Sequence, residues 1–86
     1  MGDHAKALEA LKQALAIDEK VLGAEHPNTA RDYYNLSFIY MKLHNLPDAL
    51  QYAEHALAIR VKVLGAEHPD TKLAQEQVDH LKEAQP

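Results

Sequence analysis

The chain has 86 residues and no cysteine. This composition excludes disulfide bonds, catalysis by a thiolate and zinc sites built from cysteine. Long apolar runs are also missing, since no stretch approaches the ~20 consecutive apolar residues that span a bilayer. The first residues lack the apolar core that is typical of a signal peptide. A reducing compartment suits such a chain, and we expect a cytoplasmic protein.

Clustered basic residues are absent too. Lys and Arg number 9 against 13 Asp and Glu, which gives a formal net charge of −4 with neutral histidines. Proteins that bind nucleic acids or anionic membranes usually present groups of Lys and Arg to the phosphates. We therefore expect neither a nucleic acid nor a membrane among the partners of this protein.

The sequence also lacks motifs for catalysis. It contains no Gly-rich phosphate loop and no nucleophile elbow, and its single serine, Ser37, stands where a small residue must pack between helices. We expect no enzymatic activity and no cofactor. Six histidines suggest a metal site. Glu76 and His80 have a helical i, i+4 spacing, but two exposed ligands make a poor site. We therefore expect no metal ion.

What the chain does contain is a long internal duplication. Residues 14–29 read ALAIDEKVLGAEHPNT and residues 56–71 read ALAIRVKVLGAEHPDT, so that 13 of 16 positions are identical at an offset of 42 residues. The differing pairs are Asp18/Arg60, Glu19/Val61 and Asn28/Asp70. A fixed period of this size predicts a repeat architecture, in which similar helical units stack on one another and present a surface.

Helix-forming residues and a few breakers divide the chain into four predicted helices. Ala and Leu dominate, and strand signals are absent. Asp3 is the expected N-cap of the first helix and Gly23 its expected left-handed end, whereas Pro27 suits the first position of the second helix. His26 and His68 precede prolines, and we expect each side chain to cap the following helix. The predicted helices span residues 3–22, 27–43, 47–64 and 69–84.

The helices differ in polarity. The second is apolar nearly all round and is expected to be central, whereas the fourth is polar where the second carries aromatic residues. We expect Tyr33, Leu36 and Tyr40 to face the third helix. The carboxylates Asp18 and Glu19 are interpreted as part of a solvated helix face.

One pattern resembles a known family. The spacing Tyr33-x-x-Leu36-Ser37-x-x-Tyr40, followed by alanines at positions 49, 53 and 56, resembles the tetratricopeptide repeat (TPR), in which small residues let paired helices approach closely. Its usual period is 34 residues. The 42-residue period and the VLGxEHPxT linker look like the kinesin light chain subclass. The resemblance implies an all-α fold of antiparallel helical hairpins stacked as a short right-handed solenoid.

Two departures and one unusual register accompany this resemblance. His44 stands where the family usually has Gly, and Leu46 where it usually has Tyr. We expect a single domain over residues 1–86, made of a half repeat (3–26), a full repeat (27–68) and a terminal half repeat or capping helix (69–86). The first helix thus lacks a partner, which indicates either a piece of a longer array or a chain that self-associates.

The resemblance implies a protein–protein interaction module or scaffold that binds a peptide or helix on the concave side of its helices. The matching positions are Arg31, Tyr34, Asn35, Phe38, Met41 and Lys42 in the second helix and Leu73, Glu76, Gln77 and His80 in the fourth. An alternative is that Tyr34 and Phe38 only pack against the first and fourth helices. The alternative function is self-assembly into a homodimer or larger oligomer through the incomplete ends, including by helix exchange.

Overall fold

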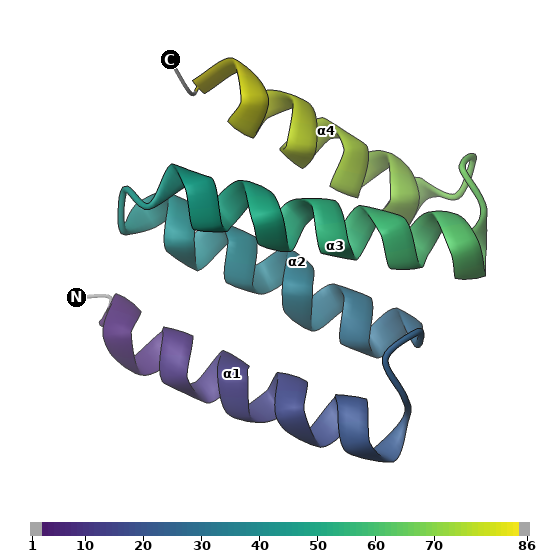
Figure 1. The fold of residues 1–86 in the computed structure, drawn as a ribbon, viewed down its shortest axis with the longest axis horizontal. Coiled ribbons are helices and arrows are strands. Elements are labelled where there is room, and N and C mark those ends of the chain that lie inside the picture. The colour runs from purple at the N-terminus through teal and green to yellow at the C-terminus, as the bar shows by residue number, and fades with distance from the viewer. Residues whose placement is uncertain (1–2, 85–86) are drawn as a thin grey trace.

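The computed structural model describes residues 3–84 and contains four helices over that range. They are α1 (His4–Val21), α2 (Pro27–Lys42), α3 (Leu46–Leu64) and α4 (Pro69–Ala84). Each helix packs chiefly on its neighbours in the chain, and α3 lies in front of α2 in the view of Figure 1. The predicted all-α solenoid is confirmed, with helix ends within one residue of those expected. None of these helices is both long and apolar enough to cross a membrane.

Side-chain caps explain where the helices begin. Asp3 Oδ1 accepts a hydrogen bond from the Lys6 amide at 3.2 Å, as an N-cap should. His26 Nδ1 accepts from the Asn28 amide at 3.0 Å, and His68 Nδ1 accepts from the Asp70 amide at the same distance. The predicted capping role of both histidines is therefore confirmed, and it is identical in the two copies of the duplicated block.

Left-handed residues explain where the helices end. Gly23 has a φ of 100° and Gly65 a φ of 91°, a region that L side chains rarely adopt. His44, with a φ of 62°, takes the same hand after α2 without being glycine. Histidine is among the residues that tolerate this conformation best, so the turn between α2 and α3 forms without the glycine usual at this position.

The tightest packing lies between α2 and α3. Three alanines of α3, at positions 49, 53 and 56, are completely buried, as is Leu36 of α2. Small side chains let two helix backbones approach closely. Tyr33 and Tyr40 border this contact, where their rings stack on that of Tyr52 with centroids 5.9 and 5.2 Å apart. The expectation that the tyrosine stripe faces α3 is confirmed.

A buried arginine and an apolar side of α4 form the α3–α4 junction. Arg60 of α3 is only 6% exposed, and its guanidinium donates to the Asp70 carbonyl at 2.9 Å. Ala74, Val78 and Leu81 form the buried side of α4. Most other side chains of α4 are polar and exposed. This pattern gives α4 a polar outer face.

Candidate interaction surface

The predicted binding residues of α2 surround an aromatic pair. The rings of Tyr34 and Phe38 meet edge to face with centroids 4.9 Å apart, and both side chains are half-buried. The Arg60 guanidinium lies 4.6 Å from the Tyr34 ring centroid, a cation–π geometry. Burial raises the pKa of Tyr34, so this phenol stays neutral at physiological pH. Tyr34 thus helps to hold α2 on α3, whereas Phe38 has no such second contact among the ring and cation contacts of residues 3–84.

Cations flank this aromatic pair. Arg31 and Lys42 are exposed near the two ends of α2, and Asn35 and Met41 are half-buried between them. The two cations are eleven positions apart in the helix, which is about 16 Å along the axis. Met41 packs against the hydrophobic core. The exposed side of α2 therefore has an apolar centre and a positive charge towards each end.

The predicted residues of α4 divide into exposed and buried ones. Leu73 is 47% exposed, and Glu76 and His80 also reach solvent. Gln77 is only 6% exposed, and its Nε2 donates to Ser37 Oγ of α2 at 3.4 Å. This bond joins the two helices, and Ser37 itself is fully buried, as its packing role requires. Gln77 therefore offers almost no accessible surface, whereas the other nine predicted residues reach solvent at least in part.

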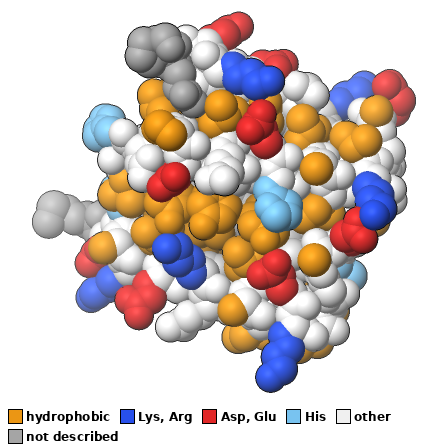
Figure 2. All heavy atoms as spheres, viewed as in Figure 1, with side chains coloured by type: hydrophobic (Ala, Val, Ile, Leu, Met, Phe, Trp, Pro, Cys, Tyr) orange, Lys and Arg blue, Asp and Glu red, His pale blue; other side chains and the backbone are white. Residues whose placement is uncertain are grey.

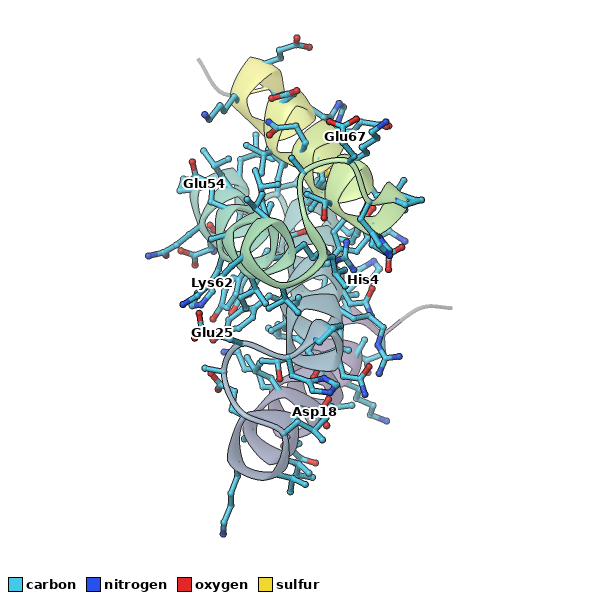
Figure 3. All side chains as sticks on the ribbon, turned by 90° about the vertical axis from the view of Figure 1, so that its right-hand side faces the viewer. His4, Asp18, Glu25, Glu54, Lys62 and Glu67 are labelled. Carbon is cyan, nitrogen blue, oxygen red and sulfur yellow. The ribbon has the colours of Figure 1, made fainter. Side chains whose placement is uncertain are left out.

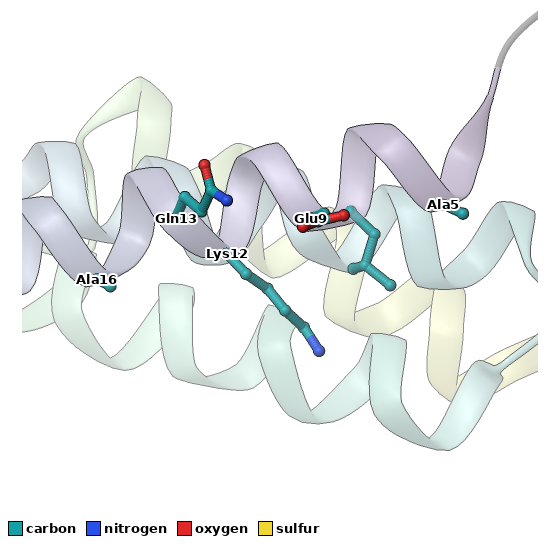
Figure 4. Close-up of a pocket in the computed structure, with 6 residues that line it drawn as sticks. Ala5, Glu9, Lys12, Gln13 and Ala16 are labelled. Atoms are coloured by element: carbon teal, nitrogen blue, oxygen red, sulfur yellow. The ribbon is translucent and has the colours of Figure 1, made fainter.

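A second surface lies on α1, where the sequence predicted an uncovered helix but not the hollow that the structure shows. An open hollow of about 400 Å³ lies along this helix. Lys12 extends from α1 towards a neighbouring helix (Figure 4), and its ammonium lies 5.8 Å from the Tyr40 ring centroid. The hydrogen bond with Tyr40 raises the pKa of Lys12. The lining residues are Ala5, Leu8, Glu9, Lys12, Gln13 and Ala16.

Apolar side chains reach the molecular surface beside this hollow. On the face seen in Figure 2, they gather near the middle of the molecule, between α3 and α1, with charged side chains around them. The missing cover of α1, which was read from the repeat register, is the signal that could have indicated this region. A hollow depends on how neighbouring helices meet, so its position does not follow from the sequence pattern.

The acidic residues at the end of α1 are not a solvated face, and that interpretation was wrong. Glu19 Oε2 accepts a hydrogen bond from the Tyr33 hydroxyl at 2.9 Å. Burial and, to a smaller extent, this hydrogen bond raise the pKa of Tyr33 to about 12. Asp18 lies within hydrogen-bonding reach of Asp32, which is 4% exposed. Both carboxylates therefore belong to the contact between α1 and α2.

Comparison with known families agrees with this geometry. One tetratricopeptide repeat model matches residues 29–70, which is one full 42-residue period and contains most of α2 and all of α3. A second tetratricopeptide repeat model matches residues 1–40, which contain α1 and most of α2. Together the two matches extend over residues 1–70. The chain belongs to the tetratricopeptide repeat family. TPR units are protein–protein interaction or scaffold modules, and proteins or peptides are their usual partners.

Two curated relatives are far longer than this TPR chain. The Clustered mitochondria protein homolog of Danio rerio is 41% identical over 51 residues, which are 59% of this chain and 4% of the relative. The Clustered mitochondria protein homolog of Homo sapiens is 40% identical over 50 residues, 58% of this chain and 4% of the relative. The match therefore concerns a short segment of each relative and a little more than half of this chain.

Proposed function

We propose that this TPR chain binds an extended peptide or a helix of a partner protein on the exposed sides of α2 and α4. The observation that carries this proposal is the apolar centre of α2, where Phe38 and Met41 stay partly accessible although α2 is the central helix of the stack. Leu73 of α4, 47% exposed, adds to that apolar surface. Aromatic and Met side chains are effective anchors for peptides.

The charges around this surface favour a particular partner. Arg31 and Lys42 lie near the two ends of α2, and Glu76 and His80 are on α4. A segment with an apolar centre and an acidic residue beyond each end would meet the two cations of α2. Asn35, which is half-buried, can donate to and accept from an extended backbone. The proposal also divides the chain into a half repeat, a full repeat and a terminal capping helix.

A peptide-display selection followed by affinity measurements tests the proposal. Phe38→Ala and Leu73→Ala are each expected to lower the affinity for a selected peptide at least tenfold, which is the loss typical of an interface anchor. Val61→Ala, at an exposed apolar residue of α3, is the matched control and is expected to leave binding unchanged. Tyr34 is avoided because its ring also contacts Arg60. If the selected peptides bind Phe38→Ala and Leu73→Ala with normal affinity, these residues do not form the binding surface.

Self-assembly through α1 is a second candidate, supported by a separate observation. Ile17 is 61% exposed and Val21 72% exposed, whereas Ile59, the equivalent of Ile17, is 5% exposed. These residues continue a heptad-spaced series on α1, which is Ala7, Ala10, Ala14, Ile17 and Val21. In an antiparallel pair of α1 helices, the large side chains of one copy would lie over the small alanines of the other. A second copy is therefore the occupant we propose for this face.

Such a pair would be weak. One helix per copy buries less than the ~800 Å² per partner that stable interfaces use, so dimers are expected only at high concentration. Light scattering over a concentration series is the measurement. Ile17→Glu is expected to abolish the dimer, and Val63→Glu, at a 41% exposed residue of α3, is the control. A chain that stays monomeric at millimolar concentration would remove this candidate and leave the peptide surface untouched.

A further inference from the structure

The α1–α2 junction contains a buried carboxyl group without a suitable partner. Asp32 of α2 is 4% exposed. Its Oδ2 is the one buried side-chain nitrogen or oxygen atom within residues 3–84 that lacks a hydrogen-bond partner. The neighbouring carboxyl is that of Asp18 on α1, labelled in Figure 3. Two carboxylates in contact repel each other when both are ionised, and burying a charge without a counter-charge is costly.

The equivalent junction elsewhere in the chain has no such pair. At the offset of 42 residues, Asp18 corresponds to Arg60 and Asp32 corresponds to Ala74. Arg60 donates to the Asp70 carbonyl and covers the Tyr34 ring, and Ala74 is fully buried. One junction is therefore built around an acid pair, and the other around an arginine and an alanine.

We propose that the Asp18–Asp32 pair is a proton-dependent latch, which holds α1 on α2 while the two carboxyls share one proton and loosens α1 when both are ionised. A proton bound between the carboxyls removes one charge and supplies the missing hydrogen-bond donor. Loosening of α1 exposes the apolar side of α2 that Leu15 now covers, so the latch couples acidity to the surface available for partners.

The charged groups around the latch do not cancel its effect. Arg31, the neighbour of Asp32 on α2, lowers the pKa of Asp32, but its effect is smaller than the effects of burial and of Asp18, which raise that pKa. Glu19 of α1 accepts from Tyr33, whose raised pKa keeps it neutral over the relevant range. His26 caps α2 through its Nδ1, and His68 caps α4 in the same way. The histidine contribution is therefore common to both junctions.

The direction of the pH dependence follows from the shifted group. Burial chiefly, and then the hydrogen bond and charge of Asp18, raise the pKa of Asp32 from 3.8 to about 6. When α1 detaches, Asp32 enters water and returns to an ordinary carboxyl pKa of about 4. The attached state then binds the proton more tightly. Attachment of α1 is thus strongest in acid, weakens as the pH rises from about 4 through about 6, and is constant above that range.

Amide hydrogen exchange of the whole chain tests the latch without any mutation. Protection factors, which correct for the intrinsic chemistry of exchange, are compared between α1 and α4 at pH 5 and pH 8. The ratio of α1 to α4 protection is expected to fall about tenfold between these values. In a carbon-detected titration, the Asp32 carboxyl is expected to titrate near pH 6. A carboxyl that titrates near pH 4, or a constant ratio, would overturn the proposal.

Variants separate the latch from a general effect of acidity. Asp32→Asn keeps the shape and removes the charge, so the α1 to α4 ratio should become independent of pH. Glu83→Gln, at an exposed position of α4, should retain the response of the unmodified chain. A tenfold change that persists in Asp32→Asn would refute the latch. If Asp32→Asn fails to fold, the carboxyl titration of the unmodified chain decides alone.

Discussion

The two copies of the duplicated block carry the same residues into different surroundings. Ile17 is 61% exposed and Ile59 is 5% exposed, although both end the sequence ALAI. Ala14 is half-buried, whereas its equivalent Ala56 is fully buried. The reason is position in the stack, because α3 lies between α2 and α4 whereas α1 packs chiefly on α2. Identical local sequence therefore fixes the helix but not the burial of its outer side.

The differing positions of the block extend this comparison to polar contacts. Arg60 makes a hydrogen bond across the α3–α4 junction and a ring contact with Tyr34 of α2. Asp18, at the same position of the first copy, meets a second carboxyl across the α1–α2 junction. An exposed ion pair between Lys62 and Glu25, both labelled in Figure 3, connects α3 to the loop after α1. Exposed pairs of this kind contribute little to stability.

Truncation of the two equivalent isoleucines should give the largest difference. Ile59→Ala is expected to lower the free energy of unfolding by about 2–5 kcal/mol, because the buried side chain leaves a cavity. Ile17→Ala is expected to change it by less than about 0.5 kcal/mol, since that side chain is exposed. Urea unfolding followed by circular dichroism, at low protein concentration, measures both. Similar losses in the two variants would mean that the outer side of α1 is covered in solution.

Enlargement of the two equivalent alanines should give the next largest effect. Ala56→Leu inserts methyl groups between α3 and α2 and is expected to cost about 1–3 kcal/mol of unfolding free energy. Ala14→Leu is expected to be close to neutral, because its side of α1 is open. Thermal melting of both variants is the measurement. A stable Ala56→Leu variant would contradict the close approach of α2 and α3.

Removal of the arginine should have a smaller effect. Arg60→Met keeps an unbranched apolar side chain but loses the bond to the Asp70 carbonyl and the contact with Tyr34. It is expected to cost about 1–2 kcal/mol of unfolding free energy. Arg31→Met, at an exposed position, is the control and should change stability by less than about 0.5 kcal/mol. Equal effects would show that the buried contacts of Arg60 add nothing to the junction.

The capping histidines should give the smallest effects, and equal ones. His26→Ala and His68→Ala each remove one acceptor from the first turn of a helix, which is expected to cost about 0.5–1 kcal/mol. Urea unfolding compares the two variants. A clear inequality would show that the shared linker has a different role in each copy.

Much of this architecture could be predicted from the sequence because it depends on local chemistry. The caps Asp3, His26 and His68 and the left-handed Gly23 act within a few residues, so residue type and spacing are sufficient to locate them. The tyrosine stripe of α2 was also predictable, since helical periodicity places Tyr33, Leu36 and Tyr40 on one face. The predicted binding residues follow from the family resemblance, and their role stays a prediction.

Other features depend on contacts between helices and were missed or misread. Asp18 and Glu19 looked like a solvated pair, yet Tyr33 and Asp32 approach them from α2. Gln77 was placed on the binding surface, but its side chain turns inward to Ser37. Helical periodicity gives the direction of a side chain about its own axis. It does not give the distance to the next helix.

The sequence alone determined four helices, their ends and their order of stacking, because capping, glycine conformation and apolar periodicity act over a few residues. Only the tertiary structure decided which copy of each repeated residue is buried, which carboxyls meet, and where a hollow opens along α1. These properties depend on neighbours that are far away in the chain. Two identical stretches therefore differ according to what packs against them.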